Sequence, residues 1–356
     1  MGVYSKIEWC DATLDIISGC RNGCPYCYAK ALTRRFSGDT RWNLSQTEKY
    51  TVTEDGLYIL KDPFFNEDGR QIIYPFGFEP TLHLYKMTDE TTEKRIMRGR
   101  SKRVFVGAMS DTFGNWVPDD WIQKIFDLCG MFELNYYLFL TKNPKRYQEL
   151  IGKGMLLDKS NFWYGTSVTS ESDKNRIGFL PPEEQYHTFI SYEPMLGPLD
   201  FTEFDTGKKP FDWMIMGAQT GQNCKKVYPE REWVKQAVAF ARSKEIPVFM
   251  KDSLIPFIGE KNMLREYPPE LLVRKRSIKT RKKLEASCMM CGKVTDKSSM
   301  VGISGRLSTR GYGSHSIGYM CWDCLEKFCE EHGLDYEHVR EGIRKELPVK
   351  KRKVRT

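Results

Sequence analysis

The chain has 356 residues, of which 40% are hydrophobic and 13% aromatic, enough for one large domain and a small one. It contains no run of about 18 or more apolar residues, and its N-terminus lacks the apolar stretch of a signal peptide. These features exclude the membrane-spanning and secreted classes and predict a soluble cytoplasmic protein without a membrane partner. The net charge of +8 is modest for this length and is consistent with a nucleic-acid partner without requiring one.

Three cysteines with the spacing C-x3-C-x2-C lie near the start of the chain: Cys20, Cys24 and Cys27. Cysteine thiolates hold iron–sulfur clusters, and three ligands on a four-iron cluster leave one iron open to another molecule. The alternatives are a zinc knuckle that lacks its fourth ligand, a disulfide beside a spare thiol, or plain buried cysteines. Structural zinc takes four ligands, whereas this loop offers three and no nearby histidine. The spacing therefore favours a [4Fe-4S] cluster.

The chain has eleven cysteines, and without an export signal metal ligands are favoured over disulfides. Cys10 and Cys224 lie beside predicted active-site loops and are minor candidates for a reactive thiol, which needs exposure and a lowered pKa. Cys129 is expected to be an ordinary buried residue of a helix.

Residues 38–100 are rich in Gly, Asp, Pro and aromatic residues and are interpreted as an insertion near the cysteine loop, either covering the site or elaborating the surface. Beyond it, strand-like apolar runs alternate with helical patterns, which is typical of parallel β/α construction. The expected strands are 103–107, 136–140, 162–165, 187–190, 213–216 and 247–250, and the expected helices are 118–126, 144–151 and 231–244. With a strand leading into the cysteine loop, these units predict an α/β fold, a partial (β/α) barrel over residues 1–265.

The carboxyl ends of barrel strands meet at one mouth, so the polar residues that end each strand are candidates for an active site. Glu193 and Lys142 are the predicted catalytic residues, and a structural salt bridge of Glu193 with Lys142 or Arg176 is the alternative. Lys142 and Lys251 face the same mouth in this prediction and would favour an anionic substrate.

The composition changes from residue 266 onwards. A linker over 266–286 carries seven positive charges within residues 274–283, and a second basic segment follows at 341–356. These segments indicate a nucleic-acid partner whose phosphates they would contact, although a solvated tail is the alternative.

Between the basic segments, over residues 287–340, two C-x2-C pairs are separated by 29 residues. This pattern is typical of tetrahedral zinc, with the four ligands Cys288, Cys291, Cys321 and Cys324. We expect a zinc-ribbon or treble-clef-like module with strands at 301–305 and 310–319. An auxiliary iron–sulfur cluster is the alternative, and His315 and His332 are weaker ligand candidates.

The cysteine loop, with Tyr26 before its last cysteine, resembles the cluster loop of radical S-adenosylmethionine (radical SAM) enzymes. Further stretches resemble a phage-protein group of that superfamily, named for phage gene products 37 and 68, and more distantly spore photoproduct lyase: residues 6–9, 11–13, 76–80, 104–111, 140–144 and 190–200. The likeness covers residues 5–255. There are two departures: Cys10 in place of Thr, and Met-Gly-Ala-Gln-Thr-Gly at 216–221 in place of Gly-Gly-Glu-Ser-Gly. The second removes a carboxylate and so bears on the substrate or the SAM contacts rather than the fold.

The resemblance implies an enzyme in which Cys20, Cys24 and Cys27 bind the cluster and the open iron binds SAM. An electron from a flavodoxin- or ferredoxin-like reductant would cleave SAM to a 5′-deoxyadenosyl radical. Tyr26 would pack beside the adenine or the cluster, Thr166 and Ser167 would contact the ribose or the carboxylate, and the methionine amino group would be held by Gly107, Ala108, Met109, Ser110 and Asp111. Barrel packing of Gly107 and strand-end capping by Thr166 and Ser167 are the alternatives.

The motifs do not identify the substrate, and nucleic acid or a nucleotide is favoured over a peptide. The competing class is a non-enzymatic metal-binding module that docks nucleic acid or a protein partner. In that case the three loop cysteines would hold a structural metal with a recruited fourth ligand such as Cys10.

Overall fold

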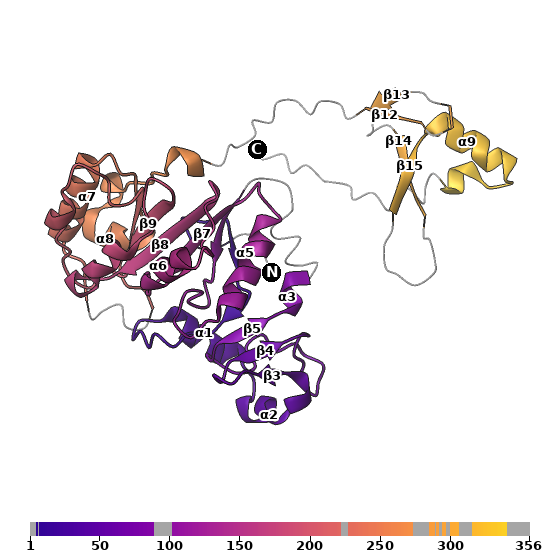
Figure 1. Cartoon of the computed structure of the whole chain (residues 1–356). Helices are drawn as coiled ribbons and strands as arrows, with labels where there is room; N and C mark the ends of the chain where they lie inside the picture. Colours follow the sequence, from indigo (N-terminus) through magenta and orange to yellow (C-terminus); the bar gives the residue numbers. More distant parts are fainter. Residues whose placement is uncertain are drawn as a thin grey trace. The chain divides into compact units, whose positions relative to one another are not determined.

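The computed structural model describes residues 5, 7–88, 102–221, 227–272, 285–288, 290–291, 294–296, 300–305 and 315–339. The chain divides into two compact units, Met1–Arg274 and Lys275–Thr356 (Figure 1). Cys224, the charged stretch 274–283, the tail 341–356 and part of the predicted insertion lie outside the described residues. Among the described helices, none is long and apolar enough to cross a membrane.

A seven-stranded, all-parallel sheet forms the first unit. Its strands follow one another in the order β1 (Ala12–Leu14), β6 (Arg103–Val106), β7 (Tyr136–Thr141), β8 (Phe162–Val168), β9 (His187–Tyr192), β10 (Trp213–Met216) and β11 (Val248–Met250). All six strands predicted after the cysteine loop are found, each within a few residues of its expected bounds. The sheet has β1 and β11 at its two edges, so the predicted partial (β/α) barrel is confirmed.

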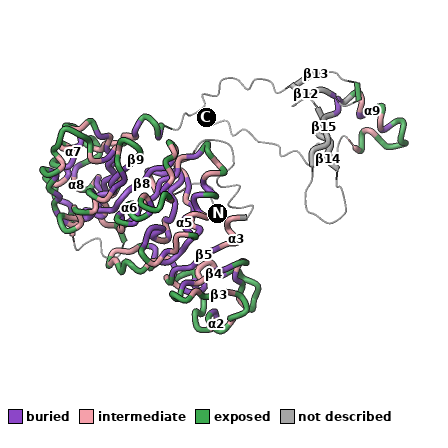
Figure 2. The backbone as a smooth tube through the Cα atoms, viewed as in Figure 1, coloured by how far each residue is buried: buried purple, intermediate pink, exposed green. Residues whose placement is uncertain are grey.

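Three main helices connect the strands: α5 (Asp119–Gly130), α6 (Lys145–Gly152) and α7 (Arg231–Ser243). The first two begin directly after Pro118 and Pro144, whose fixed φ suits a helix start. A further short helix is α8 (Ile255–Ile258). Six 3-10 helices are also found along this unit: Thr47–Lys49, Glu171–Phe179, Thr202–Phe204, Asp252–Leu254, Glu260–Asn262 and Pro269–Leu271. Figure 2 shows the sheet buried and the outer helix surfaces exposed.

Side chains on the sheet alternate between two separate apolar clusters, as the period of two requires. Val104, Phe139 and Tyr164 belong to the larger cluster, which also contains buried residues of α5, α6 and α7. The opposite face carries Phe105, Leu138, Trp163, Phe189, Trp213 and Phe249. The helices therefore cover one face, and a second apolar core fills the concave one.

The segment before β1 completes this concave core. Trp9 is 2% exposed, and its ring lies 4.7 Å from that of Phe105 and 6.3 Å from that of Trp213. Next to it, Glu8 accepts a hydrogen bond of 2.8 Å from the Asp252 amide and forms a 2.8 Å ion pair with Arg265. The start of the chain is thus tied to residues that follow the opposite edge strand, β11.

Three strands of the predicted insertion pair with β2, which precedes the cysteine loop, in a small four-stranded sheet with the order β2 (Ile17–Ser18), β5 (Thr81–His83), β4 (Tyr58–Leu60) and β3 (Thr51–Val52). Three helices accompany it: α1 (Tyr28–Phe36), α2 (Thr40–Ser45) and α3 (Tyr85–Thr88). Its separate core contains Leu60, Phe64, Ile72 and Phe76. Because β2 leads directly into the cysteine loop, this small sheet supports the root of that loop.

The second unit contains two antiparallel strand pairs and a helix. The pairs are β12 (Glu285–Ser287) with β13 (Val294–Asp296), and β14 (Met300–Gly305) with β15 (His315–Cys321). The helix α9 (Trp322–Glu331) begins directly after β15. Among the described residues of this unit, the buried apolar core is a small cluster that contains three cysteines: Cys288, Met320, Cys321, Leu325 and Cys329.

Candidate active site and metal centre

A cavity of about 220 Å³ lies at the carboxyl ends of the parallel strands, the position where barrel active sites form. It brings together eleven of the thirteen site residues predicted in this unit: Cys20, Cys24, Tyr26, Cys27, Gly107, Ala108, Ser110, Asp111, Lys142, Ser167 and Glu193. Met109 and Thr166 do not line it. The Met109 carbonyl accepts from the Gly19 amide at 2.9 Å, and the Thr166 hydroxyl donates to the Thr141 carbonyl at 3.0 Å.

The cysteine loop is held against two other turns by its backbone. The Gly19 amide bonds to the turn after β6, and the Cys20 amide donates to the Phe78 carbonyl at 3.2 Å. At its other end the Cys27 sulfur caps α1 by accepting from the Lys30 amide at 3.4 Å. The loop thus begins after β2, where its first two amides are hydrogen-bonded to other turns, and ends at Cys27, directly before α1.

The thiols of this loop have the donor chemistry of an iron–sulfur cluster. All three are free and partly exposed, and all line the cavity. The described residues contain one group of candidate metal ligands within 4.8 Å of one another, and the loop cysteines are not in it. Three cysteine thiolates that face one cavity are a donor set that can hold a four-iron cluster and leave one iron open.

The residues that directly follow β7, β9 and β11 are charged and line the cavity: Lys142, Glu193 and Lys251. Glu193 forms an ion pair with Lys251, not with the expected partners Lys142 or Arg176. Arg176 instead pairs with Asp173 at 2.9 Å. A Cβ atom at Gly217 would meet the Glu193 carboxyl carbon at 3.0 Å, so this glycine leaves room for the carboxylate beside Lys251.

Lys142 lies above the aromatic ring of Tyr26, with its Nζ 5.9 Å from the ring centroid. Its ammonium has no carboxylate within ion-pair distance among the described residues. Burial raises the pKa of Tyr26, so its phenol stays protonated at neutral pH. The cavity therefore holds two lysines, Lys251 paired with Glu193 and Lys142 with no carboxylate partner among the described residues.

The residues that line this cavity and that sequence reasoning missed include Trp9, Asn22, Tyr28 and Phe78. The Tyr28 hydroxyl donates to the Ala108 carbonyl at 2.6 Å and so joins α1 to the turn after β6. Asn22 and Phe78 stood inside motifs that had been recognised, which is the signal that could have found them. Trp9 also stands in a recognised stretch, residues 6–9, but it reads as an ordinary core residue, and only the packing brings it to the cavity.

The two other cysteines that the structure describes in this unit, Cys10 and Cys129, do not line the cavity. Cys10 is 5% exposed, and burial raises its pKa to about 12, so the prediction of a reactive thiol there is wrong. Its sulfur bonds to the Ser5 hydroxyl at 3.4 Å within the concave core. Cys129 is fully buried in α5 as expected.

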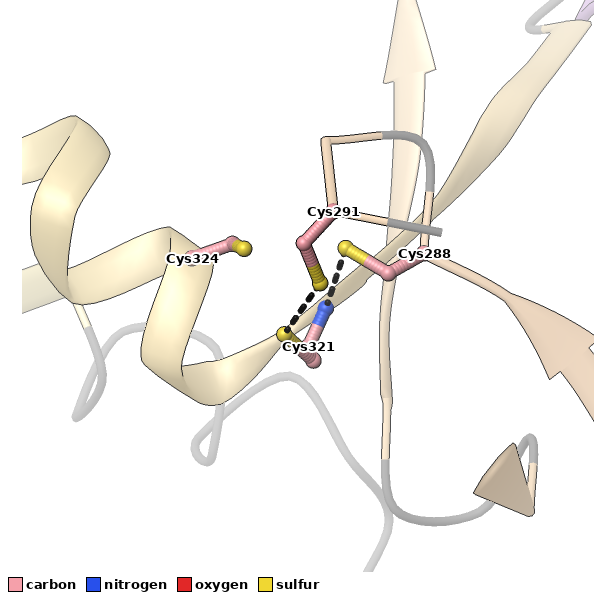
Figure 3. Close-up of side chains that lie close together, drawn as sticks. All are labelled: Cys288, Cys291, Cys321 and Cys324. Carbon is pink, nitrogen blue, oxygen red and sulfur yellow. Dashed lines mark hydrogen bonds between the residues drawn. The ribbon is translucent and has the colours of Figure 1, made fainter. Parts of the chain in front are cut away.

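The second unit holds the compact group of candidate metal ligands, formed by Cys288, Cys291, Cys321 and Cys324 (Figure 3). All four sulfurs lie within 4.8 Å of one another, as ligands of one ion would. The Cys288 sulfur accepts from the Cys321 amide at 3.4 Å, and such backbone hydrogen bonds lower its pKa to about 6. A thiolate is thereby favoured, which is the form that binds metal.

The fold and the cavity define a partial (β/α)-barrel protein with a cysteine loop at the mouth and a second, four-cysteine unit. A family model described as "Protein of unknown function (DUF5131)" matches residues 4–254, and the chain belongs to this family. No curated protein sequence matches the chain.

Solved structures of spore photoproduct lyase are similar to this chain over most of its length. A mutant with dinucleoside spore photoproduct has a TM-score of 0.34 and 12% identity, covering 90% of this chain and 70% of that one. Another mutant, with bound AdoMet and dinucleoside spore photoproduct, has a TM-score of 0.32 and 12% identity, covering 89% and 70%. Values this low do not establish a common function.

Proposed function

We infer that this protein is a radical SAM enzyme that uses a [4Fe-4S] cluster held by Cys20, Cys24 and Cys27. The observation that carries the proposal is the position of the loop. Three free thiols line a cavity at the mouth of an open parallel sheet. Three thiolates on four irons leave an open coordination position inside that cavity. Assignment to the phage-protein group stays a prediction.

When bound, the cluster would supply the electron that cleaves SAM to a 5′-deoxyadenosyl radical. The residues of this chain bind and orient the reactants. The turn 107–111 places backbone carbonyls beside the cysteine loop, where they can accept from an ammonium group, and Lys142 offers a positive charge to a carboxylate or phosphate. Glu193 and Lys251 form a hydrogen-bonded pair that lines the same cavity and is able to hold or pass a proton at the substrate.

For the substrate we favour nucleic acid or a nucleotide, with a flavodoxin- or ferredoxin-like protein as the electron donor. The support is chemical: Lys142 in the cavity has no carboxylate partner among the described residues, and the sequence carries seven positive charges within residues 274–283. For the second unit we favour zinc, because the four sulfurs lie close enough together to bind one ion and four thiolates need no further ligand. An auxiliary iron–sulfur cluster is the alternative there.

The competing function is a binding protein that uses the loop cysteines for a structural metal. That function needs a fourth ligand beside the loop. Cys10, the residue expected to supply it, is directed into the concave core and is not among the cavity residues. This placement favours the enzyme.

Anaerobic reconstitution with iron and sulfide, followed by dithionite reduction in the presence of SAM, tests the proposal. We expect a brown protein that forms 5′-deoxyadenosine, with loss of product in Cys24→Ala. The matched control is Cys129→Ala, because that thiol is buried in α5 away from the cavity. A colourless protein that leaves SAM intact would overturn the proposal and favour the binding module.

A further inference from the structure

Asp111, in the turn after β6, is bonded to three separate segments of the chain. Its Oδ1 accepts from the Thr141 hydroxyl at 2.7 Å and from the Phe113 amide at 3.2 Å. Its Oδ2 accepts from the Lys142 amide at 3.0 Å and from the Asn22 side-chain amide at 2.8 Å. Asp111 is only 5% exposed, so its carboxylate is largely shielded from water.

These four donors leave the Asp111 carboxylate no free acceptor position. An ionised carboxylate has about four lone-pair sites on its two oxygens, and each is taken by one of the donors. A SAM ammonium group could bind this side chain only by displacing a protein donor. The geometry is that of an anchor and not of an open ligand site.

The Asn22 bond is the informative one of the four. Asn22 stands between Cys20 and Cys24, is exposed, and is 89 residues away from Asp111 in the sequence. The other three donors lie within or next to the strand ends and would stabilise the turn whether or not a cysteine loop existed. The Asn22 amide alone ties the loop itself to this carboxylate.

We propose that Asp111 and Asn22 are positioning residues that fix the cysteine loop against the carboxyl ends of β6 and β7. Through the Lys142 amide the same carboxylate also fixes the strand end that carries the unpaired cation of the cavity. One buried charge thus sets the position of the cysteines relative to Lys142. The proposal rests on the proposed function only in taking this loop to be the cluster-binding loop.

Hydrogen exchange of the metal-free protein tests the anchor directly. We expect Asn22→Ala to speed amide exchange within residues 20–28 about tenfold, as the loss of one charge-assisted hydrogen bond implies. Exchange in β8 and β9 should not change. The control is Asn66→Ala, because Asn66 also donates to a carboxylate within an exposed turn, at 3.3 Å to Asp68. This control should leave residues 20–28 at the wild-type rate.

A double-mutant cycle separates the anchor from a general loss of stability. Asp111→Asn should speed exchange of the loop at least as much as Asn22→Ala, and the double variant should exchange no faster than Asp111→Asn alone. Iron retained after reconstitution and gel filtration should fall several-fold in both single variants. Unchanged exchange of the loop in Asn22→Ala, or effects that multiply in the double variant, would overturn the proposal.

Failure of the two proposals can be told apart. Exchange is measured without metal and without SAM, so the anchor can be confirmed even if reconstituted wild-type protein leaves SAM intact. Because Asn22 is exposed, its alanine variant should fold normally, and this variant keeps the test decisive if Asp111→Asn is unstable.

Discussion

At the scale of single residues, Gly19 decides how the chain enters the cysteine loop. It has a φ of 85°, in the left-handed region that favours glycine, and it lies against the backbone of the small sheet. A Cβ atom there would lie 2.2 Å from the Glu79 carbonyl oxygen, a contact that backbone atoms cannot relieve without moving. Strain and crowding thus act at the same position.

We expect Gly19→Ala to destabilise the protein by about 2–3 kcal/mol and to lower its iron content after reconstitution, because the loop must move to admit the methyl group. Gly23→Ala is the matched control. Its φ is 66°, but nothing lies within 4 Å of the added atom, so its cost should be only about 1 kcal/mol. Urea unfolding of the two variants measures the difference, and equal costs would contradict the account.

His83 is a second residue with a specific environment, because it is completely buried under the loop. One ring nitrogen bonds to the Ser18 hydroxyl at 2.8 Å, and Nδ1 has no hydrogen-bond partner among the described residues. Burial, helped by the positive charge of Lys86, holds the pKa of this imidazole well below its usual value. The ring is therefore neutral in the folded protein at physiological pH.

This lowered pKa predicts the sign of a pH effect on stability. Below the unfolded-state pKa of about 6.5, the unfolded chain binds a proton that the folded protein does not. The free energy of unfolding should then fall by about 1.4 kcal/mol per pH unit as the pH drops below 6.5, until the folded-state pKa is reached. Urea unfolding between pH 8 and 5 should show a smaller slope for His83→Gln than for the wild type, and parallel slopes would contradict it.

At the scale of elements, the segment before β1 acts as a part of the barrel. Trp9 contacts aromatic rings from β6, β9 and β10 and also lines the cavity. Trp9 therefore belongs both to the concave core and to the lining of the candidate active site.

Trp9→Ala should cost about 3–5 kcal/mol of stability, since it removes a buried indole from a close-packed core. Trp233→Ala is the control, because Trp233 on α7 is only partly buried against the outer core and should cost less. Thermal and urea unfolding of the purified variants give both values. A Trp9→Ala variant as stable as Trp233→Ala would show that the N-terminal segment does not hold the barrel together.

At the scale of the whole molecule, the two units are stabilised in different ways. The first has two extensive apolar cores, whereas the second has a small cluster that itself contains two of the four candidate metal ligands. We expect this module to depend on bound metal for its fold, because the described part of its core is small and structural zinc contributes about 10–16 kcal/mol of apparent binding energy at neutral pH.

A strong chelator should therefore abolish the unfolding transition of the second unit and leave that of the first at the same temperature. Cys291→Ser should do the same without chelator. Cys329→Ala, which removes a buried thiol outside the four-cysteine group, should retain metal and keep its transition. Differential scanning calorimetry with metal analysis is the measurement, and a single transition that shifts as one with chelator would contradict independent units.

The patterns that could be read without a structure were local ones. Alternating apolar residues in runs such as 136–140 predicted strands, and prolines at 118 and 144 marked helix starts, because strand and helix periods depend on near neighbours. The two C-x2-C pairs were recognised for the same reason: each supplies two ligands from one tight turn.

The contacts across the cavity could not be predicted in this way. Nothing local to Glu193 indicates that its partner is Lys251 rather than Lys142, since the order of strands in space decides which side chains meet. The Asn22–Asp111 bond joins positions 89 residues apart, and Cys10 turns inward although it stands beside the loop.

The amino-acid sequence alone was enough to predict the class of fold, two groups of cysteines as metal ligands, and eleven of the residues that line the mouth of the barrel. Parallel strands end at one edge, so the residues after each strand must converge there. Only the tertiary structure decided which of them pair, which are buried, and what holds the cysteine loop in place. Those outcomes depend on packing and on hydrogen bonds between distant segments, which no local pattern encodes.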